Sequence, residues 1–407
     1  MSHHIAIPNS EKFDPKKAAT LKTVFQGMAA IGLIGSLLTL LINTDHGNFG
    51  KLFGFSWLFA FFFAFTICIG AFFWNCLHHA TDSEWSVVIR RQLENVSALL
   101  KYVAVLFIPI AVILVVKPDL MYSWIKPHLD DSLMEGSKGK YLNISYFWVR
   151  AIGIFGLLFL LSGILRKRSM AQDIDGKAVH TFKMRAAAIA GIPVMALSVT
   201  FGGIDWLKSL NHHWYSTMWG VYLFAGAAGS SMAVAILVCK WLKSLGYLQP
   251  VTNEHFHTMG KFIFAFTVFW GYIGYSQYML ITYANIEEET IYFRLRNTES
   301  WTYLSHFLVF GRFFFMFVPL LFQGMKKSKG IIFCASWIIL MQCLDLFIII
   351  IPEYAPGGFS FTGFIACAIT LIAVVGILGM GFLRHLGEGY LFPTKDPRLA
   401  ESLKLSN

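Results

Sequence analysis

The sequence predicts an all-α polytopic membrane protein with ten transmembrane helices. Of its 407 residues, 56% are hydrophobic and only 14% are charged. Apolar runs recur from one end of the chain to the other, and each is long enough to cross about 30 Å of hydrocarbon as a helix. The expected spans are residues 24–41, 53–73, 99–116, 144–165, 186–204, 217–239, 261–283, 303–322, 331–351 and 361–383.

Lysine and arginine are unevenly distributed between the two sides of these spans. The two tails and the connections on their side carry 23 of them, and the opposite connections carry 8. Arg150 and Arg312 lie inside spans and belong to neither side, whereas Lys101 and Lys261, at the starts of their spans, are counted with the connections. Because basic connections stay in the cytoplasm, we expect both termini there. The same asymmetry explains the net charge of +10, so we expect membrane lipids and no nucleic acid as partners.

Spans two to five form a weak parallel repeat of spans six to nine. Basic and acidic residues recur at related positions in the two sets: Lys101 and Lys261, Arg150 and Arg312, Asp205 and Asp345. Corresponding spans of the two sets are four helices apart, an even number, so the two repeats have the same orientation. The predicted architecture is therefore two four-helix bundles plus two peripheral helices.

This reading divides the chain into six parts. They are a cytoplasmic tail (1–23), a peripheral helix with its loop (24–52), the first bundle with a surface connector (53–216), the second bundle (217–360), a peripheral helix (361–383) and a second cytoplasmic tail (384–407).

The connector within residues 201–226 is the most unusual stretch. It carries Asp205, His212 and His213 among many aromatic residues, which prefer the headgroup level of a membrane. An aspartate at the bilayer centre costs roughly 2.5–3.5 kcal/mol, so such a group is expected to face protein or a wet cavity. We therefore expect chemistry near this connector.

Ionisable groups in or beside the spans are candidates for a proton path. They are Asp205, Asp345, Arg312, Arg150, Lys101, Lys261 and His306. Intramembrane ionisable residues often mark such paths. Two structural alternatives remain open: Arg312 pairs with an acid or with carbonyls, and Asp345 makes a buried structural hydrogen bond. His78 and His79 are expected to be solvated at the cytoplasmic surface, with proton entry as the alternative.

A quinone pocket is the second kind of candidate site. Tyr272, Tyr275 and Ser276 form a hydroxyl-bearing stripe at helical spacing. Together with Asp205, His212 and His213 they are the residues we expect to line it.

No tightly bound cofactor is expected. Of thirteen histidines only His306 lies clearly inside a span, whereas haem in a bundle needs axial histidines on facing helices. The six cysteines form no Cys-x-x-Cys motif, which argues against iron–sulfur and c-type haem sites. We expect no metal site either.

Two stretches carry a family resemblance: DWLKSLNHHWYSTMWGVYLFAG and FWGYIGYSQYMLITYANIEEETIYFRLR. They resemble the F subunit of alternative complex III, a bacterial quinol:electron-acceptor oxidoreductase, within the superfamily of polysulfide-reductase-type membrane subunits. The resemblance runs through most of the chain. Glu287 stands where the family pattern has a proline.

The resemblance implies a bacterial inner-membrane subunit with no redox centre of its own. Its implied partners are a paralogous membrane subunit, an iron–sulfur subunit and c-type cytochromes, with a terminal oxidase as a further candidate. Quinone or menaquinone is the implied ligand class, and a proton half-channel the implied activity. Two alternatives stay open: a scaffold without chemistry in the same complex, and a secondary transporter.

Overall fold

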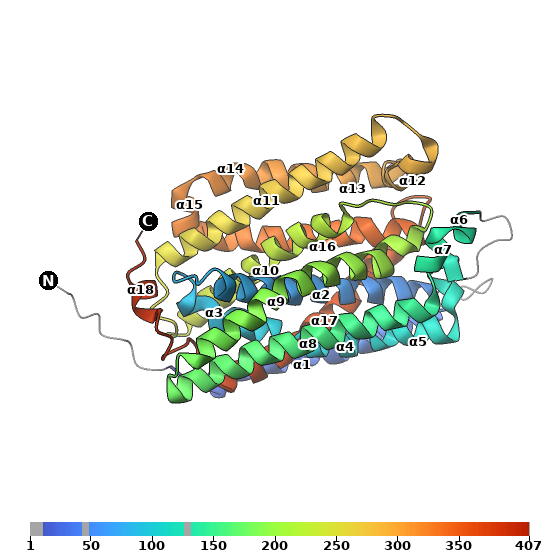
Figure 1. Cartoon of the computed structure of the whole chain (residues 1–407). Helices are drawn as coiled ribbons and strands as arrows, with labels where there is room; N and C mark the ends of the chain where they lie inside the picture. The colour runs from blue at the N-terminus through green and yellow to red at the C-terminus, as the bar shows by residue number, and fades with distance from the viewer. Residues whose placement is uncertain (1–10, 43–48, 126–131, 407) are drawn as a thin grey trace.

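The computed structural model describes residues 11–42, 49–125 and 132–406. Parts of the expected N-terminal tail, of the loop before residue 53 and of the first bundle (1–10, 43–48 and 126–131) lie outside the described residues. The described chain is helical, and its long helices lie side by side along one direction (Figure 1).

Ten helical segments correspond to the expected spans. They are α1 (Ala19–Leu38), α2 (Lys51–Ala80), α4 with α5 (Leu100–Leu106, Ile108–Val116), α8 (Ile144–Asp175), α9 (Val179–Gly202), α10 (Trp219–Ser244), α11 (Asn253–Thr282), α13 to α14 (Glu299–Val309, Phe315–Leu321), α16 (Gly330–Tyr354) and α17 (Phe361–Gly387).

Shorter elements connect them. These are η1 (Pro15–Ala18), η2 (Thr39–Leu41), α3 (Val87–Ser97), η4 (Pro118–Leu120), η5 (Ser123–Ile125), α6 (Ser132–Glu135), α7 (Ser137–Tyr141), η6 (Gly203–Leu207), η7 (Lys208–Asn211), α12 (Glu287–Arg296), η8 (Phe310–Phe314), α15 (Gln323–Lys327) and α18 (Leu399–Leu403).

Nine helices in the described part of the chain are long and apolar enough to cross a membrane. The chain is therefore a multi-pass membrane protein. The expected seventh span falls in α11, which is 30 residues long. Its tyrosines and Gln277 make α11 less hydrophobic than those nine helices, so α11 is not recognised as a membrane span by length and composition alone.

Helix α2 forms the centre of the molecule. Every residue from Leu52 to Phe72 is buried, as expected for a helix that is apolar on all sides. It packs closely on α10: a Cβ on Gly70 would lie 2.2 Å from the carbonyl oxygen of Ala227. The indole of Trp74 donates to the carbonyl of Ala228 at 2.9 Å. Only glycine at position 70 permits this approach.

Helices α1 and α17 pack along each other at one side of this centre. Ser36 donates to Thr370 across their interface at 3.1 Å, which satisfies both hydroxyl groups inside the apolar contact. Much of α1 faces outward, including Ile31, which is 74% exposed. An outward apolar face of this kind suits contact with lipid.

A buried arginine completes the backbone hydrogen bonds of α16. Pro352 lies inside this helix and cannot donate to the carbonyl of Ile348. Arg296 of α12 donates instead, to Ile348 at 3.0 Å and to Ile349 at 2.5 Å. The proline is therefore tolerated because a side chain replaces the missing donor.

The two ends of the described chain lie at the same end of the molecule (Figure 1). The backbone N–H of Leu391 donates to Glu11 at 2.9 Å, and Lys12 forms an isolated antiparallel bridge with Tyr390. The segment expected as a C-terminal tail is thus folded onto the helices.

Candidate functional site

The first candidate site joins α8 to the continuation of α9. Arg150 donates from Nε to Asp205 at 2.6 Å and from Nη2 to the other carboxylate oxygen at 3.0 Å. The guanidinium carbon of Arg150 lies 4.1 Å from the centre of the Tyr141 ring, against its face. A bidentate, stacked arginine holds a carboxylate more firmly than a lysine would.

The second candidate site joins η8 to α16. Arg312 donates from Nη1 to Asp345 at 2.7 Å and from Nη2 to Gln342 at 2.7 Å. Tyr222 and Trp270 also donate to Asp345, at 2.5 and 3.0 Å. The carboxylate therefore receives three donors from three helices, so both charges are neutralised in place.

A glycine of α10 makes room for this second site. A Cβ on Gly226 would lie 2.7 Å from Gln342 Oε1 and 3.3 Å from Arg312 Nη2. The arginine and the amide can therefore pack directly against the backbone of α10, which a larger residue would prevent.

Each pair has one member in a π-helical turn. Asp205 lies in η6, and Arg312 lies in η8, which interrupts the helix between α13 and α14. π-Helical turns are rare and frequently occur at functional sites, because the extra residue re-aims a side chain. Here each turn contributes a charged group to an ion pair between helices.

The two pairs differ in their access to the surroundings. The side chain of Arg150 is 17% exposed, whereas Arg312 and Asp345 are 3% and 4% exposed. Separating a buried pair by removing one partner costs about 3–5 kcal/mol. The guanidinium of the first pair therefore reaches the surface of the molecule, although the Asp205 carboxylate is itself 1% exposed, and the second pair is enclosed by protein.

The connector histidines lie near the first pair along the chain. His212 is buried, and its Nδ1 lies 3.1 Å from the hydroxyl of Ser123. The rings of His212 and His213 are 4.1 Å apart. Farther along, Ser216 donates to Gln277 of α11 at 2.7 Å, so the connector reaches the second half of the chain.

The hydroxyl stripe of α11 points elsewhere. Tyr272 and Tyr275 are each 65% exposed, and Ser276 is half-buried. The helix touches the connector through the opposite residue Gln277, which is buried. The structure therefore does not bring Tyr272 and Tyr275 together with Asp205 and His212.

The remaining expected residues are also dispersed. His306 and Lys261 are exposed, and Lys101 is half-buried with its amine 5.2 Å from the ring of Tyr102. None of these three contributes to either arginine–aspartate pair in the described contacts.

A third polar cluster is absent from the sequence-based expectations. All residues of α3 are buried, including Arg90, Arg91 and Glu94. Arg90 donates to Glu94 at 2.9 Å, to Ser169 at 3.3 Å and to Asp396 by a short bond. In the sequence both arginines belong to the basic residues of the connection after the second expected span. The sequence does contain a signal for this cluster: Arg90 and Arg91 precede Glu94 by four and three residues, the spacing at which ion pairs form on one helix face.

The same cluster holds the C-terminal segment. Asp396 is 4% exposed and also accepts from Arg398 at 3.0 Å. Burial alone would raise the pKa of Asp396, but the nearby Arg90 and Arg398 outweigh it and lower that pKa below its usual value. The carboxylate is therefore charged at neutral pH and attaches the segment to α3.

His78 and His79 belong to this cluster rather than to solvent. They are only 3% and 1% exposed, so the expectation of solvated surface histidines was wrong. Arg90 approaches His78 Nε2 at 3.2 Å, and Ser86 lies 2.6 Å from His78 Nδ1. Arg90 of α3 therefore covers the ring of His78, and the ring of His79 packs edge-on against His78 at 4.8 Å.

Comparison with known proteins does not assign a family. No protein-family model matches the chain, and no curated protein matches it. Within the described residues, no group of three or more His, Cys, Asp or Glu side chains is placed to hold a metal ion.

Proposed function

We propose that this chain is an integral subunit of a bacterial quinol:electron-acceptor oxidoreductase of the alternative complex III type. It has no redox centre in this proposal and carries protons past the Arg150–Asp205 pair. The observation that carries the proposal is a charged pair at a π-helical turn, with its arginine 17% exposed.

The arrangement of the two pairs supports a duplicated design. In the reading as two bundles, α2, α4–α5, α8 and α9 form one unit, and α10, α11, α13–α14 and α16 form the other. Each arginine then lies on the third span of its unit, and each aspartate on the fourth or its continuation. Helices α2 and α10, the first of each unit, pack against each other.

The position of the chain ends supports ten crossings. Residues at both ends meet through the contact of Leu391 with Glu11, as expected for an even number of crossings, and we propose α11 as the tenth. Because the basic connections lie on this side, we propose that this end faces the cytoplasm. The proposed partners are a paralogous membrane subunit, an iron–sulfur subunit, c-type cytochromes and a terminal oxidase.

Replacement of Asp205 tests the proton role. In the assembled complex, Asp205→Asn is expected to lower quinol turnover and coupled proton release about tenfold or more, because an amide cannot exchange the proton. Glu288→Gln, an exposed acid on α12, is the control and is expected to leave both rates unchanged. Normal rates in Asp205→Asn with full assembly would exclude a proton path at this pair.

The enclosed Arg312–Asp345 pair favours a second candidate function. Its charges are matched within protein and are 3% and 4% exposed, as expected of a structural clamp. If the subunit is a scaffold, Asp345→Asn lowers the yield of the complex and leaves the turnover per assembled complex unchanged. A fall in turnover at normal yield would favour chemistry at this pair.

A further inference from the structure

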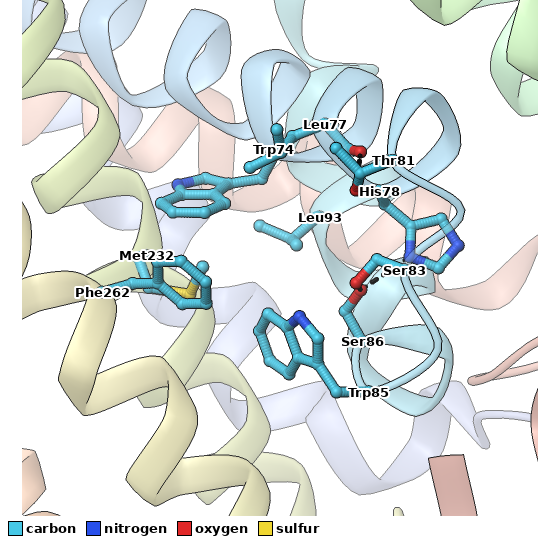
Figure 2. Close-up of a pocket in the computed structure, with 10 residues that line it drawn as sticks. All are labelled: Trp74, Leu77, His78, Thr81, Ser83, Trp85, Ser86, Leu93, Met232 and Phe262. Carbon is cyan, nitrogen blue, oxygen red and sulfur yellow. Dashed lines mark hydrogen bonds between the residues drawn. The ribbon is translucent and has the colours of Figure 1, made fainter. Parts of the chain in front are cut away.

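A cavity of about 120 Å³ lies at the end of the molecule where the chain ends meet. The end of α2, the turn after it and α3 form one side, and α10 and α11 form the other (Figure 2). Thr81 at its rim is exposed, and Ser83 and Trp85 are half-buried, so the cavity opens to the surface. A cavity of about 150 Å³ holds a benzene ring in another protein, so this somewhat smaller cavity, open on one side, has room for no more than a single ring.

The walls of the cavity are aromatic. Phe262 stacks on Trp85 with ring centres 5.4 Å apart and an angle of 25°, and meets Trp74 edge-on at 4.8 Å. The indole nitrogen of Trp74 is engaged by Ala228, so Trp74 offers the cavity only its apolar ring. Flat aromatic walls favour a planar aromatic ligand through offset or edge-to-face contacts.

The polar side of the cavity presents hydrogen-bond donors. Arg90 can only donate, so His78 Nε2, which lies 3.2 Å from it, accepts. The neutral imidazole then carries its proton on Nδ1, which donates to the Ser86 hydroxyl at 2.6 Å. The hydroxyl proton of Ser86 is left to point away, either to Ser83 at 3.4 Å or into the cavity. Figure 2 shows these groups on one side of the cavity.

Trp85 supplies a second donor. No hydrogen bond from its indole N–H is found within the described part of the chain, where only its carbonyl is engaged, by Ser402, and Figure 2 shows the nitrogen turned toward the middle of the cavity. The cavity thus combines aromatic walls with two donors, and its lining residues include no acid or base other than the neutral His78.

We propose that this cavity binds the headgroup of a quinone, with the ring between Trp74 and Trp85 and one carbonyl oxygen accepting from Trp85 Nε1 and Ser86 Oγ. A neutral ring with a carbonyl acceptor satisfies both donors without bringing a charge. This site rests on the proposed quinol-related function, and differs from the connector and the α11 stripe expected from the sequence.

Photoaffinity labelling of the full chain in its native membranes tests the site. The probe is an azidoquinone with a decyl tail, and duroquinone is the competitor. Labelled peptides are expected to cover residues 74–93 or Phe262, and duroquinone is expected to suppress the label. Labelling confined to other peptides overturns the proposal, including the case of a cavity that holds only water.

Two variants and a control link the label to the cavity. Trp85→Phe keeps the ring and removes the donor, and is expected to weaken duroquinone competition about 3- to 10-fold. Leu93→Phe fills the cavity and is expected to abolish the label. Trp148→Phe, a half-buried tryptophan of α8, is the control and is expected to change neither. Equal thermal unfolding midpoints show that all variants are folded, and unchanged competition in Trp85→Phe overturns the assigned donor.

Quinol turnover of the same preparations separates this site from the proposed function. Turnover with no label at the cavity refutes the site and leaves the respiratory role intact. A label at the cavity in a chain that co-purifies with no cytochrome or iron–sulfur protein supports the site and refutes the role.

Discussion

The Arg312–Asp345 pair allows the energetic reasoning to be tested quantitatively. Asp345→Asn leaves Arg312 facing an amide instead of a carboxylate inside protein, with 3% of its side chain exposed. Removing one partner of a buried ion pair costs about 3–5 kcal/mol, since the remaining charge keeps its desolvation penalty. We expect a loss of unfolding free energy in this range.

A second substitution separates charge from packing. Arg312→Met with Asp345→Asn removes both charges and keeps much of the volume. Because replacing both partners of a buried pair is often nearly neutral, the double variant is expected to recover most of the loss, with a coupling of about 2 kcal/mol or more.

The assay is denaturant-induced unfolding of the four proteins of this cycle in one detergent, followed by intrinsic fluorescence. The reasoning fails if Asp345→Asn alone costs less than about 1 kcal/mol, since that result means Asp345 is protonated and Arg312 is neutralised by other groups. It also fails if the double variant is as unstable as the single one.

Three further outcomes are expected. Asp396→Asn is expected to release the C-terminal segment, so that trypsin cleaves it at neutral pH. In the parent protein the pKa of Asp396 is lowered, so the attachment is fully present above about pH 4 and is lost as the pH falls below that value. A change in the trypsin sensitivity of the parent protein between pH 5 and 8 would contradict this. Gly226→Ala is expected to lower the free energy of unfolding by about 1–3 kcal/mol through overpacking. Gly27→Ala, whose added Cβ would meet open space, is expected to be neutral or stabilising. Equal changes in the free energy of unfolding for the two variants would rule out steric crowding. Arg150→Lys is expected to loosen the hold on Asp205 and reduce turnover severalfold, because lysine lacks the bidentate fork; unchanged turnover would mean that this geometry is not used.

Much of the helical organisation was predictable because long apolar runs leave few alternatives. Each of the ten expected spans coincides with helical segments to within a few residues, and nine helices of the described chain are long and apolar enough to cross a membrane. The charged residues inside spans were also recognisable, since each is expensive in hydrocarbon. Their pairing was not, because it depends on how each helix is rotated about its axis and on the two π-helical turns.

The α11 stripe and α3 show two different limits. Helical spacing places Tyr272 and Tyr275 on one face, but the spacing does not say whether that face meets protein or the surroundings, and both are 65% exposed. In α3, Arg90 looks like an ordinary cytoplasmic charge because its partner Asp396 lies 306 positions away. Contacts of that range leave no local pattern.

The bond between Arg90 and Asp396 also constrains how the protein is made. Ribosomes deliver Arg90 long before Asp396, so throughout translation α3 has an arginine without one of its permanent acidic partners. The end of the molecule around α3 cannot reach its final state until nearly the whole chain has emerged. Premature termination before residue 396 should therefore leave a full set of inserted helices with an incompletely folded end around α3, visible as proteolysis within residues 81–98.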